Sequence, residues 1–270
     1  MIDWRQWQNE PGLVGAIAVV GWLYALGVGP LRTCWAPASS FPGRAALRFA
    51  SGLVLLWLAV ASPVEQIGRY YLFSAQMCTQ MLIVYPVAWL LLTGLPSGLL
   101  DWLLGALPGS RHWGAVLFRP LSCGGAFVLG VSIWYLPRIY EWGLEREAGL
   151  AAEHLLFLFA GVLFWWPLAS PSRLFPPLRF GARMAYLFAT EVAMTAVFSY
   201  LLMAEHPLYP SYELAPRLIA SLDALDDQIF AGILLSGISS LVMVAALGAS
   251  FYRWWKSADS GAHISAGPPA

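Results

Sequence analysis

Two amide and two thioether side chains lie close together in one apolar stretch, Tyr70–Gly94. Gln76 and Gln80 are four residues apart, and Met77 and Met81 repeat that spacing beside them. On an α-helix this spacing places both members of each pair on one face. An amide in hydrocarbon is costly unless it finds a hydrogen-bond partner, so we predict that this face points into a helical bundle and not toward lipid.

The composition of the 270-residue chain indicates which kind of bundle holds these side chains. Hydrophobic residues make up 59% of the sequence and charged residues only 11%, with 14 tryptophans. This balance is typical of a polytopic membrane protein and excludes a soluble globular core. A backbone in lipid must satisfy its own hydrogen bonds, so we expect an all-α bundle of seven transmembrane helices. The predicted spans are Gly12–Gly29, Ala45–Ala61, Tyr70–Gly94, Leu121–Leu136, Ala151–Leu168, Arg183–Met203 and Ile229–Trp255.

The basic residues predict how this bundle is oriented. Of the 15 lysines and arginines, 10 fall on the side that holds the C-terminus and 5 on the other. The positive-inside rule then places the N-terminus outside and the C-terminus in the cytoplasm. We expect residues 1–256 to form a single membrane domain, and the tail 257–270, rich in Gly, Ser and Pro, to be disordered.

Further polar residues are expected at membrane depth. Because successive spans alternate in direction, His154 and Tyr135 are predicted to reach the same outer level as Gln76 and Gln80. Glu191 lies near the middle of the sixth span. An ionisable group there is a functional candidate by default, although a glutamate bonded to threonine or backbone would be structural.

Acidic residues outside the predicted spans have a structural and a functional interpretation. Asp223, Asp226 and Asp227 lie in an external loop at the start of the last span, where they would bind a hard cation or complement the positive end of the helix. We favour the helix cap. The segment Ser97–Leu107 is too short to span and is predicted to be an interfacial helix with Asp101 facing water.

Several short blocks occur in an order that resembles a known family. These blocks are LFSAQMCTQML, WYLPRIYE, EHLLFLFAGVLFWWPL, PLYPSYE and LDDQIFAGI. From about Trp22 to Arg253 the chain resembles the CtaG family of cytochrome c oxidase assembly proteins. The resemblance implies a multi-pass protein of the bacterial inner membrane, with seven spans, that takes part in copper delivery to a haem–copper oxidase.

The chain departs from the family at positions that hold histidine in the family pattern. Gln76 and Gln80 stand where the family has two histidines four residues apart. Tyr135 replaces the histidine before Leu-Pro at the end of the fourth span. Leu150 replaces the first histidine of a pair entering the fifth span, so His154 alone remains. Glutamine and tyrosine are poor ligands for Cu(I), which prefers thiolate and thioether.

The ligands that remain for copper are Met77, Cys78 and Met81, with His154 opposite them. Cys78 lies about 100° round the helix from Met77, so placing all three sulfur atoms in one shell is geometrically demanding. The alternative is structural. Methionine in a membrane helix usually packs, and a buried cysteine behaves as a small hydrophobe. The two glutamine amides would then bond to Tyr135 or to backbone carbonyls.

Two functional hypotheses follow. In the first, the chain is a CtaG-type assembly factor that assists copper insertion into, or maturation of, a haem–copper respiratory oxidase. In the second, it is a ligand-depleted homologue that acts as a non-metal scaffold or as a structural subunit of a respiratory membrane complex. Neither is an enzyme. The expected partners are a haem–copper oxidase subunit or another respiratory complex and membrane lipids, without nucleic acid.

Two other classes of membrane protein are excluded by single residues. A retinal protein needs a lysine inside its last span, and Lys256 lies past that span. A membrane haem with two axial imidazoles needs a pair of histidines within the spans, where the sequence offers His154 alone.

Overall fold

A computed structural model of the protein describes residue 7 and residues 11–36 and 41–265, and all regular secondary structure in these ranges is helical. The longer helical units are α1 (Pro11–Val28), α3 (Gly43–Ala61), the unit α5 (Phe73–Leu82), η1 (Ile83–Val87) and α6 (Ala88–Gly94), α9 (Pro120–Trp134), α11 (Glu147–Ala169), α12 (Phe180–Leu202) and α14 (Ala224–Ser265). The shorter helices are α2 (Arg32–Trp35), α4 (Pro63–Tyr70), α7 (Ser97–Ala106), α8 (Ser110–Leu117), α10 (Pro137–Glu145) and α13 (Pro210–Glu213). The predicted all-α fold is confirmed.

Five helical units are long and apolar enough to cross a membrane: α3, Phe73–Gly94, α11, α12 and the part of α14 from Ala224 to Lys256. A sixth crossing results if α8 and α9, which meet at 67°, form one bent span. The remaining predicted span, Gly12–Gly29, corresponds to α1, of which Gly12–Val28 is apolar but shorter than the roughly 20 residues that a bilayer core requires. The described residues therefore support a membrane protein with five or six spans.

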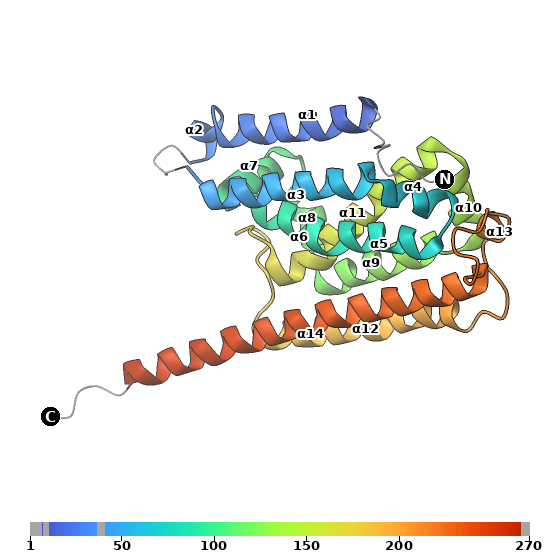
Figure 1. The fold of residues 1–270 in the computed structure, drawn as a ribbon. Coiled ribbons are helices and arrows are strands. Elements are labelled where there is room, and N and C mark those ends of the chain that lie inside the picture. Colours follow the sequence, from blue (N-terminus) through green and yellow to red (C-terminus); the bar gives the residue numbers. More distant parts are fainter. Residues whose placement is uncertain (1–6, 8–10, 37–40, 266–270) are drawn as a thin grey trace.

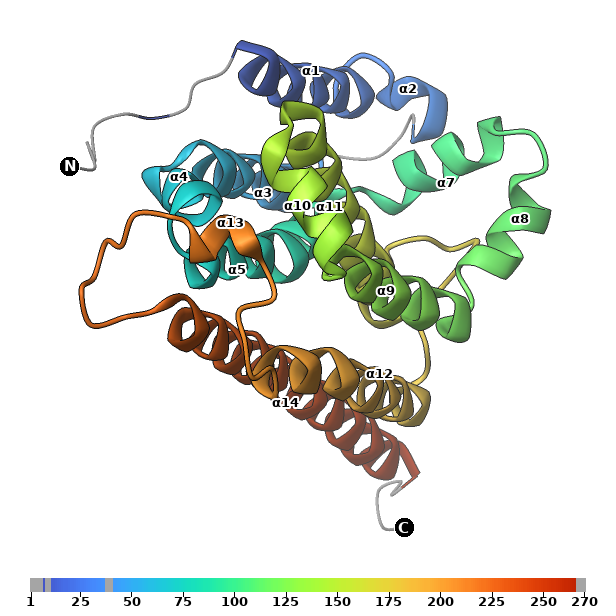
Figure 2. The same ribbon diagram turned by 90° about the vertical axis from the view of Figure 1, so that its right-hand side faces the viewer.

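The longer helices lie side by side, with α1 at one edge of the bundle and the pair α12 and α14 at the other (Figure 1). The unit Phe73–Gly94 lies at the centre, since 61% of its apolar stretch is buried against 22% to 39% in the other four candidate spans. The short helices α4, α10 and α13 gather at one end of the bundle, which faces the viewer in Figure 2. This end holds the candidate site.

The central unit contains one turn of π-helix, η1, with Pro86 inside it. Proline has no N–H to donate, so a helix interior with proline leaves a carbonyl without its usual partner, and a widened turn accommodates the ring. The indole of Trp165 on α11 donates to the carbonyl oxygen of Val84 at 3.2 Å. The widened turn thus joins the central unit to α11.

Two sequence predictions outside the site are wrong. The last helix continues to Ser265, although disorder was expected from Ser257; residues 266–270 of that predicted tail lie outside the described residues. Extending a formed helix needs no new nucleus, which favours continuation.

Asp101 does not face water freely, because it accepts hydrogen bonds from the Ser172 hydroxyl at 2.6 Å and the Arg173 amide at 3.1 Å. It fixes the loop that follows α11.

Close helix packing predicts a stability effect at Gly161 of α11. A Cβ atom at this position would lie 2.6 Å from the carbonyl oxygen of Val84 and 2.7 Å from the Cβ of Ala88. We expect Gly161→Ala to lower the free energy of unfolding by about 1–3 kcal/mol through overpacking, and to lower the thermal midpoint of the protein in detergent. Gly125→Ala on α9 is the matched control, since nothing lies within 4 Å of its added Cβ. Equal midpoints for the two variants would contradict this packing.

Candidate functional site

The candidate site is a buried polar cluster around the carboxylate of Glu153. This residue lies on α11 and is 1% exposed. Its Oε1 accepts a hydrogen bond from Nε2 of Gln76 at 3.0 Å and another from Nε2 of Gln80. Both glutamines are fully buried on one face of α5, as the four-residue spacing predicted. One helix therefore presents two amide donors to one carboxylate of its neighbour.

Gln80 uses both ends of its amide group. Its Oε1 accepts a hydrogen bond from the hydroxyl of Tyr135 at 2.7 Å, and the same hydroxyl lies 3.2 Å from the Sδ atom of Met77. Tyr135 follows the last residue of α9 and is buried. The predicted hydrogen bond between a glutamine of the central helix and Tyr135 is confirmed.

A second buried carboxylate, Glu65 of α4, extends the cluster. Its Oε1 lies 3.1 Å from Nε2 of His154 and 3.4 Å from Nε2 of Gln76. The other oxygen, Oε2, has no hydrogen-bond partner among the described residues. His154 follows Glu153 on α11. Two adjacent residues of this helix therefore belong to the cluster, Glu153 as the acceptor for the glutamines and His154 as the partner of Glu65. Glu65 thus holds the imidazole of His154.

Three further buried tyrosines pack beside Tyr135 at this end of the bundle. The hydroxyl of Tyr209 donates to the backbone oxygen of Tyr135 at 2.9 Å. Tyr212 donates to the backbone oxygen of Gly68 at 2.7 Å, and its hydroxyl lies 3.2 Å from that of Tyr140. Burial raises the pKa of Tyr140 and of Tyr212 well above the ordinary value, so both phenols remain neutral donors at physiological pH.

The segment that carries these tyrosines is tied down by side chains from neighbouring helices. Glu141 of α10 accepts hydrogen bonds from the backbone N–H of Ser211, at 3.1 Å, and from its hydroxyl. Gln228 of α14 accepts from the Leu208 amide at 2.8 Å and donates to the Leu201 carbonyl at 3.2 Å. Residues of the PLYPSYE and LDDQ blocks therefore form hydrogen bonds that stabilise this part of the fold.

The three aspartates near the start of α14 have different roles. Asp223 precedes the helix and accepts from the backbone N–H of Asp226 at 2.8 Å, as an N-cap residue does. Asp226 is exposed. Asp227 is buried and accepts from the backbone N–H of Ser74 at 3.3 Å and from its hydroxyl, which satisfies a free N–H in the first turn of α5. These contacts agree with the favoured cap, although Asp227 caps a different helix.

Glu191 lies on α12 and serves a separate contact. Its two carboxylate oxygens accept hydrogen bonds from the hydroxyls of Ser239, at 2.8 Å, and Ser240, at 2.7 Å, on α14. Ser239 also receives a hydrogen bond from the hydroxyl of Tyr85 at 3.0 Å. Glu191 was a candidate polar residue of the membrane interior together with Gln76, Gln80 and Tyr135. The structure places it apart from their cluster, and both of its carboxylate oxygens have hydrogen-bond partners.

The donors predicted for copper lie in different surroundings in this structure. Met77 and Met81 are buried in the apolar core, whereas Cys78 is half-buried on another side of α5. The polar contact of Met77 is with Tyr135 and that of His154 is with Glu65. Among the described residues, no group of three histidine, cysteine, aspartate or glutamate side chains is arranged to hold a metal ion.

One protein family matches almost the whole chain. The family model for the cytochrome c oxidase caa3 assembly factor, Caa3_CtaG, matches residues 22–257. The chain belongs to this family. No curated protein and no solved structure matches it significantly. Membership identifies the chain as a cytochrome c oxidase assembly factor, and the matched range contains the entire polar cluster of this CtaG protein.

Two members of the cluster, Glu65 and Glu153, were missed in the sequence. Glu153 was visible as an ionisable residue in the first two turns of an apolar helix, and such a group needs partners as much as Glu191 does. Glu65 gives a weaker signal in the sequence, since the preceding Ser62-Pro63 is also typical of a turn. In the structure Pro63 instead begins α4, whose inner face carries Glu65. Two amides on a buried face call for acceptors, which these carboxylates provide.

The cluster predicts that Glu153 is important for stability. Glu153→Leu leaves the amide groups of Gln76 and Gln80 without their common acceptor, and each unsatisfied group costs about 1–3 kcal/mol. We expect the free energy of unfolding, measured by reversible denaturation in mixed micelles, to fall by about 3 kcal/mol. Glu147→Leu is the control on the same helix, because Glu147 is exposed in the first turn and contributes only about 0.3–1 kcal/mol through the helix dipole. Similar losses in both variants would argue against the cluster.

Proposed function

We propose that this CtaG-family assembly factor assists maturation of a haem–copper respiratory oxidase through protein contact, as a scaffold or structural subunit, without binding copper at the family's histidine positions. The observation that carries this proposal is the hydrogen bonding of Gln80. Its amide nitrogen donates to Glu153 and its amide oxygen accepts from Tyr135, which stands at another of the family's histidine positions. A side chain whose amide oxygen is already hydrogen-bonded within the protein is not free to ligate copper.

The proposal includes a topology. The chain would cross the bacterial inner membrane seven times, with α1 and the bent unit of α8 and α9 supplying two of the crossings. The asymmetry of basic residues, 10 against 5, supports an N-terminus outside and a C-terminus in the cytoplasm. The polar cluster and its tyrosines would then lie near the outer surface. We propose no catalytic role for any residue of the chain.

The loop between α13 and α14 offers a surface for contact with the oxidase. Leu214 is 85% exposed, Ile219 50% and Leu218 37%, although the loop lies outside the candidate spans. Exposed apolar side chains that gather on one loop are typical of interaction sites. The hydrogen bonds of Ser211 and Gln228 hold the loop's surroundings in place. We propose that a haem–copper oxidase subunit docks here.

Replacement of these three side chains tests the docking surface. We expect Leu214→Ser with Leu218→Ser and Ile219→Ser to reduce the amount of oxidase that co-purifies with the protein in mild detergent at least tenfold, because the apolar contact area is lost. Glu205→Gln with Glu213→Gln is the control, since both glutamates are exposed and lie close to the loop in the sequence. Unchanged co-purification in the apolar variant would reject this surface.

Copper delivery by Met77, Cys78, Met81 and His154 is the second candidate function. One observation favours it. The Sδ atom of Met77 lies 3.2 Å from the hydroxyl of Tyr135, so a soft donor reaches the buried polar cluster. A thioether is a suitable ligand for Cu(I). In this alternative the copper ion is cargo, received at the outer end of the bundle and passed to the oxidase.

Copper stoichiometry separates the two candidates. The full chain, purified in detergent under reducing conditions, is incubated with Cu(I) and a competing chelator. On the contact mechanism we expect wild type to retain no more copper than the volume-conserving variant Met77→Leu with Met81→Leu, because amide and phenol oxygens are poor ligands for Cu(I). About one copper per chain in wild type, lost in that variant, would overturn the contact mechanism and establish a thioether site.

A further inference from the structure

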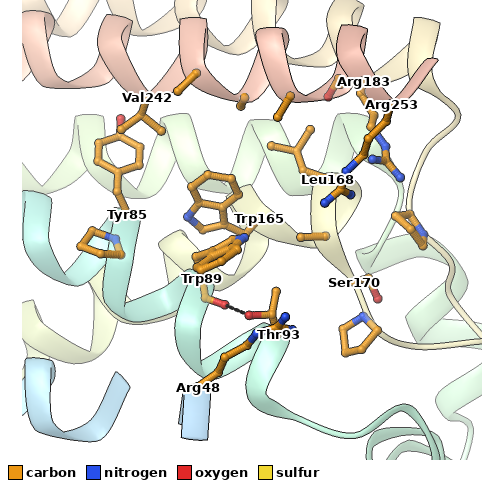
Figure 3. A pocket seen from close by; sticks show the side chains of 18 residues that line it. Arg48, Tyr85, Trp89, Thr93, Trp165, Leu168, Ser170, Arg183, Val242 and Arg253 are labelled. Carbon is orange, nitrogen blue, oxygen red and sulfur yellow. Dashed lines mark hydrogen bonds between the residues drawn. The ribbon is translucent and has the colours of Figure 1, made fainter. Parts of the chain in front are cut away.

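A second feature, distant from the polar cluster, is a cavity of about 710 Å³ bordered by α3, α6, α11, α12 and α14. Its volume is within the range of small-molecule sites. Three arginines line it, each from a different helix: Arg48 of α3, Arg183 of α12 and Arg253 of α14. Figure 3 shows Arg183 and Arg253 together at one side of the cavity and Arg48 at another. No acidic residue is among the lining residues.

These guanidinium groups have no carboxylate to balance their charge. None of the three forms an ion pair within the part of the chain that the structure describes. Arg183 donates from Nε to the Leu178 carbonyl at 2.6 Å, and its guanidinium lies over the ring of Phe180 at 5.3 Å. Both contacts hold the side chain in place and leave the positive charge uncompensated. Uncompensated positive charges that line one cavity favour the binding of an anion there.

The rest of the cavity wall is apolar and aromatic. Trp89 and Trp165 lie beside each other in this wall, with their ring centroids 6.5 Å apart (Figure 3). Leu168, Val242 and several alanines of α14 complete this wall. A small inorganic anion would use the charges but not the indole rings. The wall therefore fits a ligand that combines an anionic head with hydrocarbon.

The depth of the cavity agrees with such a ligand. Arg48 lies near the beginning of α3, Arg183 near the beginning of α12 and Arg253 close to Lys256, where the apolar part of α14 ends. Helix ends and tryptophans are typical of the membrane–water interface. This end of the bundle is the one with more basic residues, which we assign to the cytoplasm. The cytoplasmic leaflet is rich in anionic lipids, and basic pockets between membrane helices bind their head groups.

We propose that this cavity binds an anionic phospholipid, with its phosphate among the guanidinium groups of Arg48, Arg183 and Arg253 and an acyl chain along Trp89 and Trp165. The site is separate from the polar cluster and does not depend on how the chain assists the oxidase. A bound lipid would offset part of the positive charge of the three arginines and fill the space between α14 and α6. It would thereby attach the α12 and α14 pair to the centre of the bundle.

Native mass spectrometry of the full chain in detergent tests the proposal, with added phosphatidylglycerol as the probe and phosphatidylcholine as its zwitterionic counterpart. We expect wild type to prefer phosphatidylglycerol. Removal of three charges near the membrane surface, by Arg48→Gln with Arg183→Gln and Arg253→Gln, should weaken its binding about 100-fold. Circular dichroism checks that the variant keeps its helical content. If it does not, Arg253→Gln alone, at an exposed side chain, is tested for about a fivefold loss.

The control variant removes the same charge elsewhere on the same predicted side. Arg44, Arg111 and Arg179 are exposed and do not line the cavity, so Arg44→Gln with Arg111→Gln and Arg179→Gln should retain phosphatidylglycerol. Equal losses in the two triple variants would overturn the site in favour of general surface attraction. Equal binding of phosphatidylcholine by wild type would overturn the proposed preference of the cavity for an anionic head group. Full displacement by glycerol phosphate would show a head-group site without a role for the acyl chain.

Discussion

The bundle depends on the hydrogen bonds that converge on Glu153. A carboxylate and two amides inside a membrane protein are each costly alone, and the hydrogen bonds from both amides to the one carboxylate lower that cost. Glu153 accepts hydrogen bonds from Gln76 and Gln80, and Gln80 accepts one from Tyr135. The carboxylate of Glu65 contacts both Gln76 and His154. The cluster thereby fixes how α4, α5, the end of α9 and α11 are rotated relative to one another, which apolar packing alone specifies weakly.

The same arrangement shows what this CtaG-family chain can hold at its buried polar face. A pair of amides and a phenol offer hydrogen-bond donors, whereas imidazoles would offer nitrogen lone pairs to a metal. The polar side chains on the inner face of α5 therefore hold a carboxylate. The tyrosines of α10 and α13 pack beside the cluster and bury Tyr135.

Much of this could be predicted from the sequence, because it depends on local periodicity. The all-α class, the shared face of Gln76 and Gln80 and the level reached by Tyr135 all follow from spacing along a helix or from the order of spans. The acceptors Glu65 and Glu153 did not, since a donor's partner depends on which helices become neighbours. Glu191 shows the same limit, because the pairing of α12 with α14, which brings serine hydroxyls to it, is tertiary.

The π-turn in the central unit has a consequence for how its two halves are aligned. One residue of an α-helix corresponds to a rotation of about 100°, so the extra residue accommodated in Ile83–Val87 changes the azimuth of everything after it. Gln80 before the turn faces Glu153, while Trp89 after it faces the arginine-lined cavity. The single wide turn therefore sets the rotation of the helix face that carries Trp89 relative to the face that carries Gln80. A deletion of one residue there would swing one of them away from its partners while leaving both helical segments intact.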